Sequence, residues 1–172
     1  VNQLFRECQV RITSIALLHE TLHRSHDLSR IKMGDYIRTL TGHLFRSYGV
    51  DPTLISLELN VDDVEFDIDT GLTCGLIIDE LVSNCLKHAF IDDSGGTVHI
   101  DLLDHVDGTF TLCVSDNGIG IPKDGVLNNP DSLGLELVTL LAEKLDGSTE
   151  LRSGAGTEWQ IRFQQLQYSE RV

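Results

Sequence analysis

The chain has 172 residues, 41% of them hydrophobic, which is enough apolar material for one compact domain with an appended segment. Its 13 Lys and Arg residues stand against 27 Asp and Glu residues, giving a formal net charge of −14. Because nucleic-acid binding requires Lys and Arg to neutralise phosphates, this charge argues against a nucleic-acid partner. It also predicts that any bound polyphosphate depends strongly on a metal ion.

Targeting signals and cysteines bear on the location of the protein. No apolar run reaches the length of a membrane span, and no signal-peptide pattern opens the chain. The four cysteines form no C-x-x-C pair, and three of them occupy apolar periodic positions typical of a core. We therefore expect a reduced, cytoplasmic location without membrane contact by this chain. Because the chain begins at Val1, we also expect it to be a piece of a longer protein.

The first predicted element is a bundle helix at residues 4–25, where apolar residues recur at spacings of three and four. The stripe comprises Phe5, Cys8, Ile12, Ile15 and Leu22. Since such a stripe requires a partner, we expect a homodimer or a pairing with a further helix; packing on its own domain is the alternative. His19, His23 and His26 share this segment, but no Cys or carboxylate set with zinc-like spacing accompanies them.

A helix, a strand and a second helix follow in the middle of the chain. Helical spacing returns at residues 32–48, and strict alternation at 55–61 predicts a strand covered on one face. After an acidic stretch at 62–69 a long helix begins, with Asp69 or Thr70 as its expected N-cap.

Alternating runs and one helix dominate the second half of the chain. The runs lie at 97–103, 109–115, 147–152 and 158–163. Helical spacing at 132–145 predicts a helix that Gly147 ends. Several helices and about five mixed strands predict an α/β (α+β) two-layer sandwich, in which helices cover one face of the sheet and a bundle helix precedes it.

The long middle helix separates two kinds of residue. With a turn of about 100° per residue, Glu80, Asn84, Lys87 and His88 fall within one quadrant. The opposite arc carries Gly71, Cys74, Ile78, Leu81, Val82, Cys85 and Ala89. A carboxylate, an amide and a cation along one edge suit a magnesium–triphosphate group, because the metal takes oxygen ligands and the phosphates take the cation.

Glycine-rich segments farther along complete the pattern. Asp116 closes a predicted strand, and Gly118 and Gly120 follow it; alone, such a string is usually only a turn. A Leu-Gly-Leu triplet occupies 133–135, and a Gly-Ala-Gly-Thr run occupies 154–157.

Together these residues resemble the asparagine box and the glycine boxes of the histidine kinase, gyrase, Hsp90 and MutL ATPase superfamily, and histidine kinases fit best. The resemblance covers roughly residues 55–163. Upstream, residues 11–20 and 35–37 resemble the dimerisation segment of the kinases whose acceptor helix carries a His-Arg-Val-Lys-Asn-Asn type motif. That motif does not occur in this chain.

The resemblance implies a Bergerat-type fold that binds ATP and Mg²⁺. By the resemblance, Asn84 ligates the metal, and Glu80 holds a metal-bound water or acts as a base. It implies that Lys87 contacts the phosphates and that His88 adds a hydrogen bond there; a helix-capping role for His88 is the alternative. Asp116 would accept a hydrogen bond from the adenine amino group.

Other nucleotide contacts are also implied by the resemblance. They fall on Gly118, Gly120, Ile121, Leu133, Gly134, Leu135 and Thr157. Residues 121–133 occupy the place of the ATP lid, and Gly134 is expected to open a helix whose N-terminal amides face the phosphates.

The reaction implied is transfer of the ATP γ-phosphoryl group to a histidine outside this chain, and then to an aspartate of a response-regulator receiver domain. We divide the chain into a partial dimerisation helix at 1–29 and a catalytic domain at 30–172. Since the acceptor helix is absent, we expect the chain alone to bind ATP without phosphorylating itself. The alternatives are a serine kinase or ATPase of the same superfamily, or a nucleotide-gated interaction module without turnover.

Overall fold

The computed structural model of the protein describes residues 12, 16, 29–90, 95–121 and 132–165. Of the bundle helix expected at 4–25, only Ile12 and Ala16 lie among the described residues, and both are helical. The rest of that helix and most of the expected lid lie outside the described residues.

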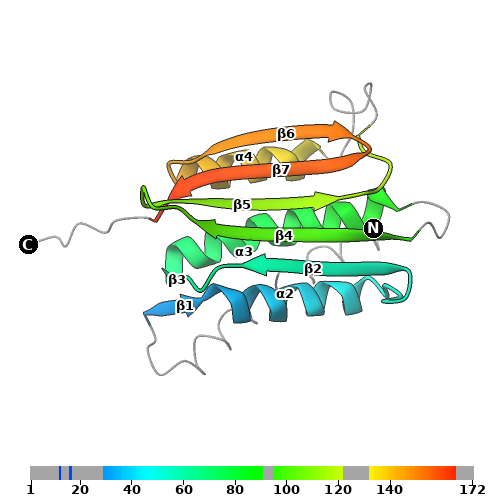
Figure 1. Cartoon of the computed structure of the whole chain (residues 1–172), viewed down its shortest axis with the longest axis horizontal. Helices are drawn as coiled ribbons and strands as arrows, with labels where there is room; N and C mark the ends of the chain where they lie inside the picture. The colour runs from blue at the N-terminus through cyan, green and yellow to red at the C-terminus, as the bar shows by residue number, and fades with distance from the viewer. Residues whose placement is uncertain (1–11, 13–15, 17–28, 91–94, 122–131, 166–172) are drawn as a thin grey trace, which may run out of the picture.

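A five-stranded mixed sheet forms one layer of the protein (Figure 1). In spatial order its strands are β2 (Ile55–Val61), β4 (Gly96–Asp104), β5 (Thr109–Asp116), β7 (Gly156–Gln164) and β6 (Ser148–Gly154). The pair β2 and β4 is parallel, and the other neighbours are antiparallel. All five strands expected from alternation are thus confirmed, with ends shifted by up to two residues.

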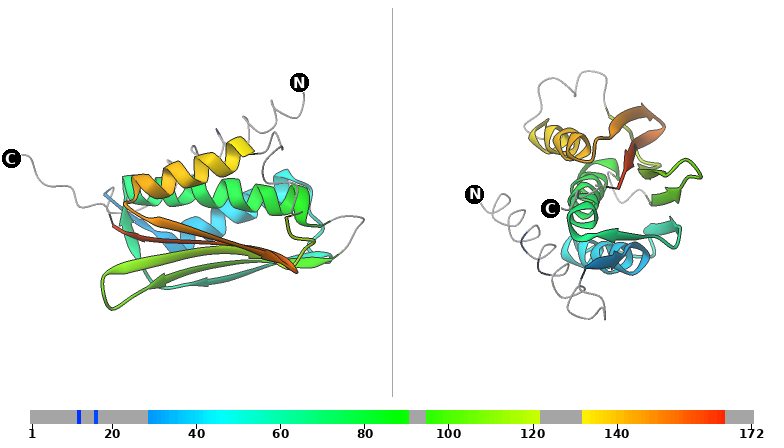
Figure 2. Two further views of the ribbon diagram at one scale, coloured as in Figure 1. Left: turned by 90° about the horizontal axis from the view of Figure 1, so that it is seen from above. Right: turned by 90° about the vertical axis from the view of Figure 1, so that its left-hand side faces the viewer.

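Helices α2 (Met33–Ser47), α3 (Ile68–Asn84) and α4 (Ser132–Lys144) lie side by side on one face of this sheet (Figure 2). The two-layer arrangement expected from the sequence is therefore confirmed. Among the described residues, no helix is long and apolar enough to cross a membrane.

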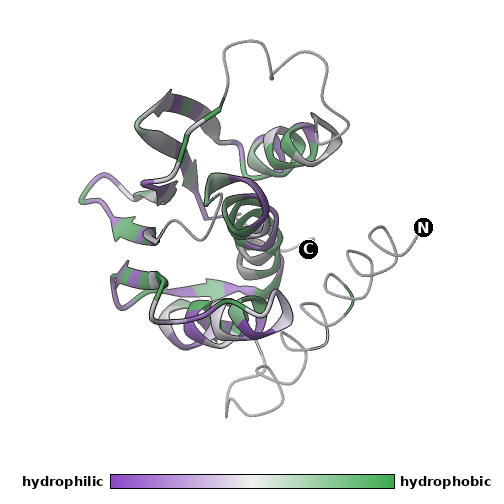
Figure 3. Cartoon of the chain, turned by 90° about the vertical axis from the view of Figure 1, so that its right-hand side faces the viewer, coloured by the Kyte–Doolittle hydropathy of each residue, from purple (hydrophilic) through white to green (hydrophobic). Residues whose placement is uncertain are grey.

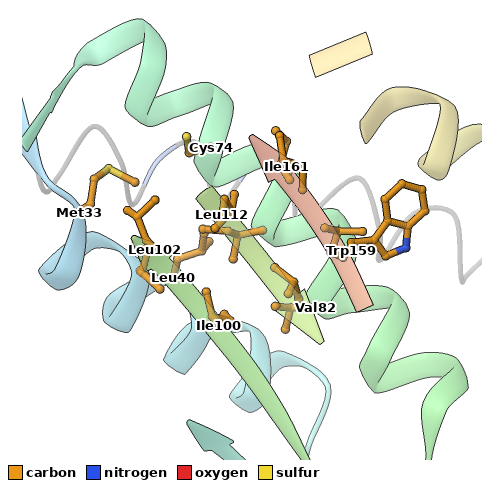
Figure 4. Packing of buried hydrophobic residues seen from close by; sticks show 14 of the residues in the cluster. Met33, Leu40, Cys74, Val82, Ile100, Leu102, Leu112, Trp159 and Ile161 are labelled. Carbon is orange, nitrogen blue, oxygen red and sulfur yellow. The ribbon is translucent and has the colours of Figure 1, made fainter. Parts of the chain in front are cut away.

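Apolar side chains fill the space between the two layers (Figure 4). Figure 3 shows that hydrophobic and hydrophilic residues alternate along the helices and strands of both layers. Every residue expected on the buried arc of α3 is buried. The core shown in Figure 4 includes Met33, Leu40, Cys74, Val82, Ile100, Leu102, Leu112, Trp159 and Ile161. Because burial of each large side chain contributes about 1.5–3 kcal/mol, this core fixes α3 firmly over the centre of the sheet.

A second, two-stranded sheet was not expected from the sequence. It pairs β1 (Arg30–Lys32) with β3 (Glu65–Asp67), with Ile31 opposite Phe66. Strand β3 runs directly into α3, so the helix begins earlier than expected and its N-cap is Asp67. The Asp67 carboxylate accepts a hydrogen bond of 2.9 Å from the Thr70 backbone N–H. The expected N-cap at Asp69 or Thr70 was therefore wrong.

The end of α4 also differs in detail from the expectation. Asp146 takes the left-handed conformation, with φ of 51°, and Gly147 follows it with its N–H bonded to the Ala142 carbonyl at 2.9 Å. The helix therefore ends where expected, but the residue that reverses the chain is an aspartate. Asp tolerates this conformation better than most residues.

Candidate functional site

The C-terminal end of α3 carries the asparagine-box residues, and it does not continue as a regular α-helix. After Asn84 the chain forms a π-helical turn, η1 (Cys85–Ala89). Hydrogen bonds in a π-turn join residues five apart, so each residue advances by less than the roughly 100° of an α-helix. The predicted alignment along one edge therefore applies to Glu80 and Asn84, which lie in α3. It changes for Lys87 and His88, which lie in the π-turn.

Glu80 lies at the contact between α3 and α4. Its side chain is buried, with 8% exposed, and its carboxylate lies against Gly134 in the first turn of α4. A methyl group at Gly134 would overlap the carboxylate oxygen Oε1. Helix α4 starts at Ser132, so Gly134 does not open the helix as expected, but it lets the helix end approach Glu80. A carboxylate beside the first turn is favoured by the helix dipole.

Lys87 and His88 occupy the π-turn and differ in exposure. Lys87 is half-buried, and its ammonium lies 6.0 Å from the centroid of the Tyr48 ring, just past the end of α2. That distance is near the outer limit of a cation–π contact. His88 is exposed. The cation is therefore held toward α2, while Glu80 faces α4.

Asp116 is a buried carboxylate and the last residue of β5, and it contacts the π-turn through Cys85. Its Oδ1 atom accepts a hydrogen bond of 2.9 Å from the Gly118 N–H, and its Oδ2 atom accepts one of 3.4 Å from the Cys85 thiol. Only 8% of the residue is exposed. One carboxylate is thus held by a loop amide and by a thiol from η1.

The glycine segment after Asp116 lies directly against the π-turn. Ile119 N–H donates to the Ala89 carbonyl at 3.0 Å, and Gly118 approaches that carbonyl so closely that a methyl group would overlap it. Glycine is required at this position for close approach of two backbones. The glycine segment after Asp116 and the π-turn after Asn84 therefore form one interlocked unit.

The far side of the glycine segment contacts the turn between β6 and β7. Gly120 has φ of 72°, and the Ile121 N–H donates to the Ser153 hydroxyl at 2.8 Å. Gly156 lies against the Asp116 carbonyl, and Thr157 pairs with Asp116 across β5 and β7. Segments far apart in sequence thus meet around Asp116.

The predicted site residues therefore fall into two groups. Around Asp116 the structure gathers Gly118, Gly120, Ile121 and Thr157. At the α3–α4 contact it brings Glu80 to Gly134, with half-buried Leu135 on the next residue of α4. Asn84 and the π-turn connect the groups. The side chain of Leu133 lies outside the described residues.

Three residues in these contacts were not predicted as part of a site. Cys85 was assigned only to the core, yet it bonds Asp116. Asn117 accepts a hydrogen bond of 2.8 Å from the Thr97 N–H, and Ser153 accepts one from Ile121. A possible signal existed for Asn117 alone, because Asn in a turn commonly bonds nearby backbone.

The described residues supply only some of the ligands that a magnesium ion needs. In the described part of the chain, no cluster of three or more His, Cys, Asp or Glu side chains could hold a metal by itself. Asn84 offers an amide oxygen and Glu80 a carboxylate, so a bound ion would take further ligands from phosphates and water. Magnesium sites in nucleotide-binding proteins are commonly completed in that way.

Two family models match the chain. Residues 71–167 match the histidine kinase-, DNA gyrase B- and HSP90-like ATPase family, and residues 1–48 match a histidine kinase family, HisKA_2. The first match spans more than half of the chain and contains Glu80, Asn84 and Asp116.

Similar proteins are histidine kinases. The chain is 32% identical over 157 residues to the sensor histidine kinase PdtaS of Mycobacterium tuberculosis, covering 88% of this chain and 30% of that protein. It is 31% identical over 104 residues to blue-light-activated histidine kinase 2 of Erythrobacter litoralis, covering 60% of this chain and 30% of that protein. The chain thus spans about 30% of the length of these relatives.

A solved structure gives the same fold. The histidine kinase domain of the Erythrobacter litoralis EL346 blue-light-activated kinase superposes with a TM-score of 0.78 at 23% identity, covering 91% of this chain and 74% of that one. A mycobacterial sensor histidine kinase, MprB, superposes with a TM-score of 0.63 at 19% identity, covering 80% of this chain and 98% of that one.

Proposed function

Because the chain belongs to the histidine kinase-, DNA gyrase B- and HSP90-like ATPase family, we propose that it holds Mg²⁺–ATP between the Asp116 segment and the end of α3. It is the catalytic, ATP-binding part of a sensor histidine kinase. The observation that carries the proposed binding mode is the contact of the π-turn with the glycine segment, through Ala89 and Ile119. This contact sets the Asn84 helix end beside the Asp116 carboxylate.

Adenine recognition is assigned to the end of β5. The Asp116 carboxylate accepts the 6-amino group, while backbone at Gly118 and Gly120 and the side of Ile121 line the base. Thr157, opposite Asp116 on β7, contributes a hydroxyl to the same edge of the ring. Guanine presents a carbonyl in place of the amino group, so the carboxylate repels it and selects adenine.

Phosphate and metal binding are assigned to the end of α3 and the start of α4. Asn84 and Glu80 hold the metal, Glu80 through water, and the bound Mg²⁺ offsets the charge of the phosphates. Lys87 and His88 face the outer phosphate oxygens from η1. Backbone amides in the first turn of α4, from Leu133 through Leu135, complement the remaining negative charge.

The reaction is in-line transfer of the γ-phosphoryl group to a histidine nitrogen, followed by transfer to an aspartate of a response-regulator receiver domain. Phosphoryl transfer depends mainly on positioning and charge neutralisation. A neutral imidazole is already nucleophilic, so no strong base is required and Glu80 need only orient water or the acceptor.

The reaction is tested by supplying labelled Mg²⁺–ATP to the full-length gene product and mapping the modified residue. We expect protein-bound label on a histidine, lost in acid and stable in alkali. Alkali-labile label on a serine would instead support a serine kinase. Release of free phosphate without labelled protein would support an ATPase, and retention of ATP without either product would support a binding module.

The metal assignment is tested with Asn84→Ala. In the unchanged chain, we expect ATP to bind more tightly with Mg²⁺ than with a chelator, because the ion offsets the −14 charge. In the variant that difference should largely disappear. Ser83→Ala, one residue earlier in α3, is the matched control. An Asn84→Ala protein with an unchanged Mg²⁺ dependence would remove Asn84 from the metal site.

The N-terminal segment is assigned to dimerisation, with the boundary to the catalytic domain near residue 29. Residues 1–48 match a histidine kinase family, and helical Ile12 exposes 66% of an apolar side chain. We expect Ile12→Glu to convert a homodimer to a monomer in light scattering without changing ATP affinity. A dimer that persists in this variant would contradict the assignment.

We place the protein in the cytoplasm, where ATP is available and buried cysteines such as Cys74 and Cys85 remain free thiols.

A further inference from the structure

The Asp116 carboxylate is held by donors from two different elements. The Gly118 N–H reaches Oδ1 at 2.9 Å, and the Cys85 thiol reaches Oδ2 at 3.4 Å, within the range for a sulfur donor. Gly118 lies two residues along the same loop, whereas Cys85 lies 31 residues earlier, in η1. The thiol is therefore the tertiary contact that ties the carboxylate to the asparagine-box helix.

Cys85 is a hydrogen-bond donor in this pair. The side chain is buried, and its sulfur lies 3.4 Å from Oδ2 of Asp116. A thiol carries a proton that it can donate, whereas a carboxylate oxygen accepts, so Cys85 is the donor. Serine would preserve this donor, while alanine would remove it with little other change to a helical turn.

Two donors leave the carboxylate with acceptor capacity. An ionised carboxylate has about four lone-pair sites, and the Gly118 and Cys85 hydrogen bonds occupy two of them. The remaining sites can accept an amino group and a water molecule. Because the two existing bonds engage different oxygens, they fix the rotation of the carboxylate and hence the direction of the free sites.

We propose that Cys85 is a positioning residue for nucleobase recognition, whose thiol holds the Asp116 carboxylate in the orientation that accepts the 6-amino group of adenine. This inference rests on the proposed role of Asp116. It assigns to Cys85 a part in selectivity beyond filling the core. Asn84, the preceding residue, is assigned to the metal, so neighbouring side chains serve opposite ends of one nucleotide.

The test compares two nucleotides that differ only in the 6-amino group of the base. Calorimetry on the intact chain, with Mg²⁺, measures the dissociation constants of ATP and of purine riboside triphosphate, which lacks the 6-amino group. We expect the unchanged chain to prefer ATP and Cys85→Ala to lower that preference about three- to tenfold, the effect of one hydrogen bond. Cys85→Ser should retain most of the preference, since a hydroxyl can donate to the same oxygen.

Cys74→Ala is the matched control, because Cys74 is a fully buried thiol on α3, about three turns before Cys85. We expect it to lower stability without changing the ratio of the two dissociation constants. The fluorescence of Trp159, the sole tryptophan, reports whether each variant is folded. If Cys85→Ala does not fold, Cys85→Val provides a second side chain without a donor.

The outcomes separate this inference from the proposed function. If the unchanged chain binds both nucleotides equally, the adenine role of Asp116 fails and the role of Cys85 fails with it. If the unchanged chain prefers ATP and the folded Cys85→Ala protein keeps the full preference, only the Cys85 inference is overturned. Loss of preference in Cys85→Ser equal to that in Cys85→Ala would also overturn it, because the donor would then be irrelevant.

Discussion

The two halves of the proposed nucleotide site are built differently. Around Asp116, the contacts are largely between backbone segments: Ile119 bonds the Ala89 carbonyl, and Gly156 lies against the Asp116 carbonyl. At the phosphate end, the groups are side chains on helices, among them Glu80 against Gly134 and Lys87 near Tyr48.

This difference indicates how each half should respond to substitutions and to nucleotide binding. Backbone contacts leave no room for adjustment, so the adenine half is preformed and sensitive to added volume. Long side chains change rotamer easily, so the phosphate half can reorganise when the nucleotide arrives. Lys87, whose ammonium lies 6.0 Å from the centroid of the Tyr48 ring, is an example of such a long side chain.

The largest expected effect comes from Gly118→Ala in the adenine half. The added methyl would overlap the Ala89 carbonyl, which is backbone and cannot rotate away, and the bond from Ile119 would be disturbed. We expect a loss of about 2–4 kcal/mol in the free energy of unfolding and loss of ATP binding. Urea denaturation followed by Trp159 fluorescence measures the first quantity.

Gly154→Ala is the matched control for that substitution, because a methyl there meets no atom within 4 Å and Gly154 lies in the neighbouring β6–β7 turn. We expect it to change stability by less than about 1 kcal/mol. Equal losses in Gly118→Ala and Gly154→Ala would show that the backbone contact at Ala89 is unimportant.

Asp116→Asn tests the adenine half by removing the charge of the side chain while keeping nearly the same volume. Its amide can no longer present two acceptor oxygens to the adenine amino group, and we expect ATP binding to weaken by about 1.5–3 kcal/mol. GTP binding should change far less. Asp101→Asn, on β4 outside the site, is the control. A variant that weakens ATP and GTP equally would contradict the adenine role of Asp116.

Lys87→Met tests the phosphate half. Since Lys87 is only half-buried, we expect loss of about 1 kcal/mol in ATP affinity, with a weaker dependence on salt. Adenosine, which has no phosphates, should bind the variant and the unchanged chain equally. Lys32→Met, at an exposed position of β1, controls for loss of a positive charge. Equal weakening of ATP and adenosine would place Lys87 outside the phosphate half.

Asp67→Ala should have the smallest effect on the site, because it acts at the opposite end of α3. Burial raises the pKa of Asp67, but hydrogen bonds from Thr70 and Gln165 lower it by more, so the pKa lies below the ordinary value of 3.8. Because the pKa is lower in the folded protein, the ionised carboxylate stabilises the fold at pH values above its unfolded-state pKa. This stabilisation is lost as the pH falls through the folded-state pKa.

We therefore expect Asp67→Ala to lose about 1 kcal/mol of stability near neutral pH, as for other N-caps, and to approach the unchanged chain below about pH 4. ATP affinity should not change. Thermal denaturation across this pH range measures the difference, with exposed Asp63→Ala as control. A constant difference at all pH values would contradict the capping role.

Long periodic elements were predictable from the sequence, and short ones were not. The alternation at 55–61 gave β2 with its observed bounds, and the apolar arc of α3 is buried as expected. Strands β1 and β3 have three residues each, too few to show a period. Strand β3 ends at Asp67, and this residue, among several acidic candidates, is the N-cap of α3.

The sequence indicated candidate site residues, but it could not indicate their contacts with one another. A helical wheel assumes a constant turn, so it cannot show the π-turn after Asn84 that moves Lys87 toward Tyr48. The bond between Cys85 and Asp116 joins residues 31 apart, and only tertiary packing reveals it. Buried cysteine is usually core material, and Cys74 is a correct example of that expectation.

The most direct test of the central claim is one calorimetric titration of the intact, folded chain with Mg²⁺–ATP, repeated with Mg²⁺–GTP. The account predicts a single site per chain for ATP and much weaker heat with GTP, because the Asp116 segment and the end of α3 form one adenine-selective site. No heat with ATP, on protein whose Trp159 fluorescence shows it folded, would contradict the account.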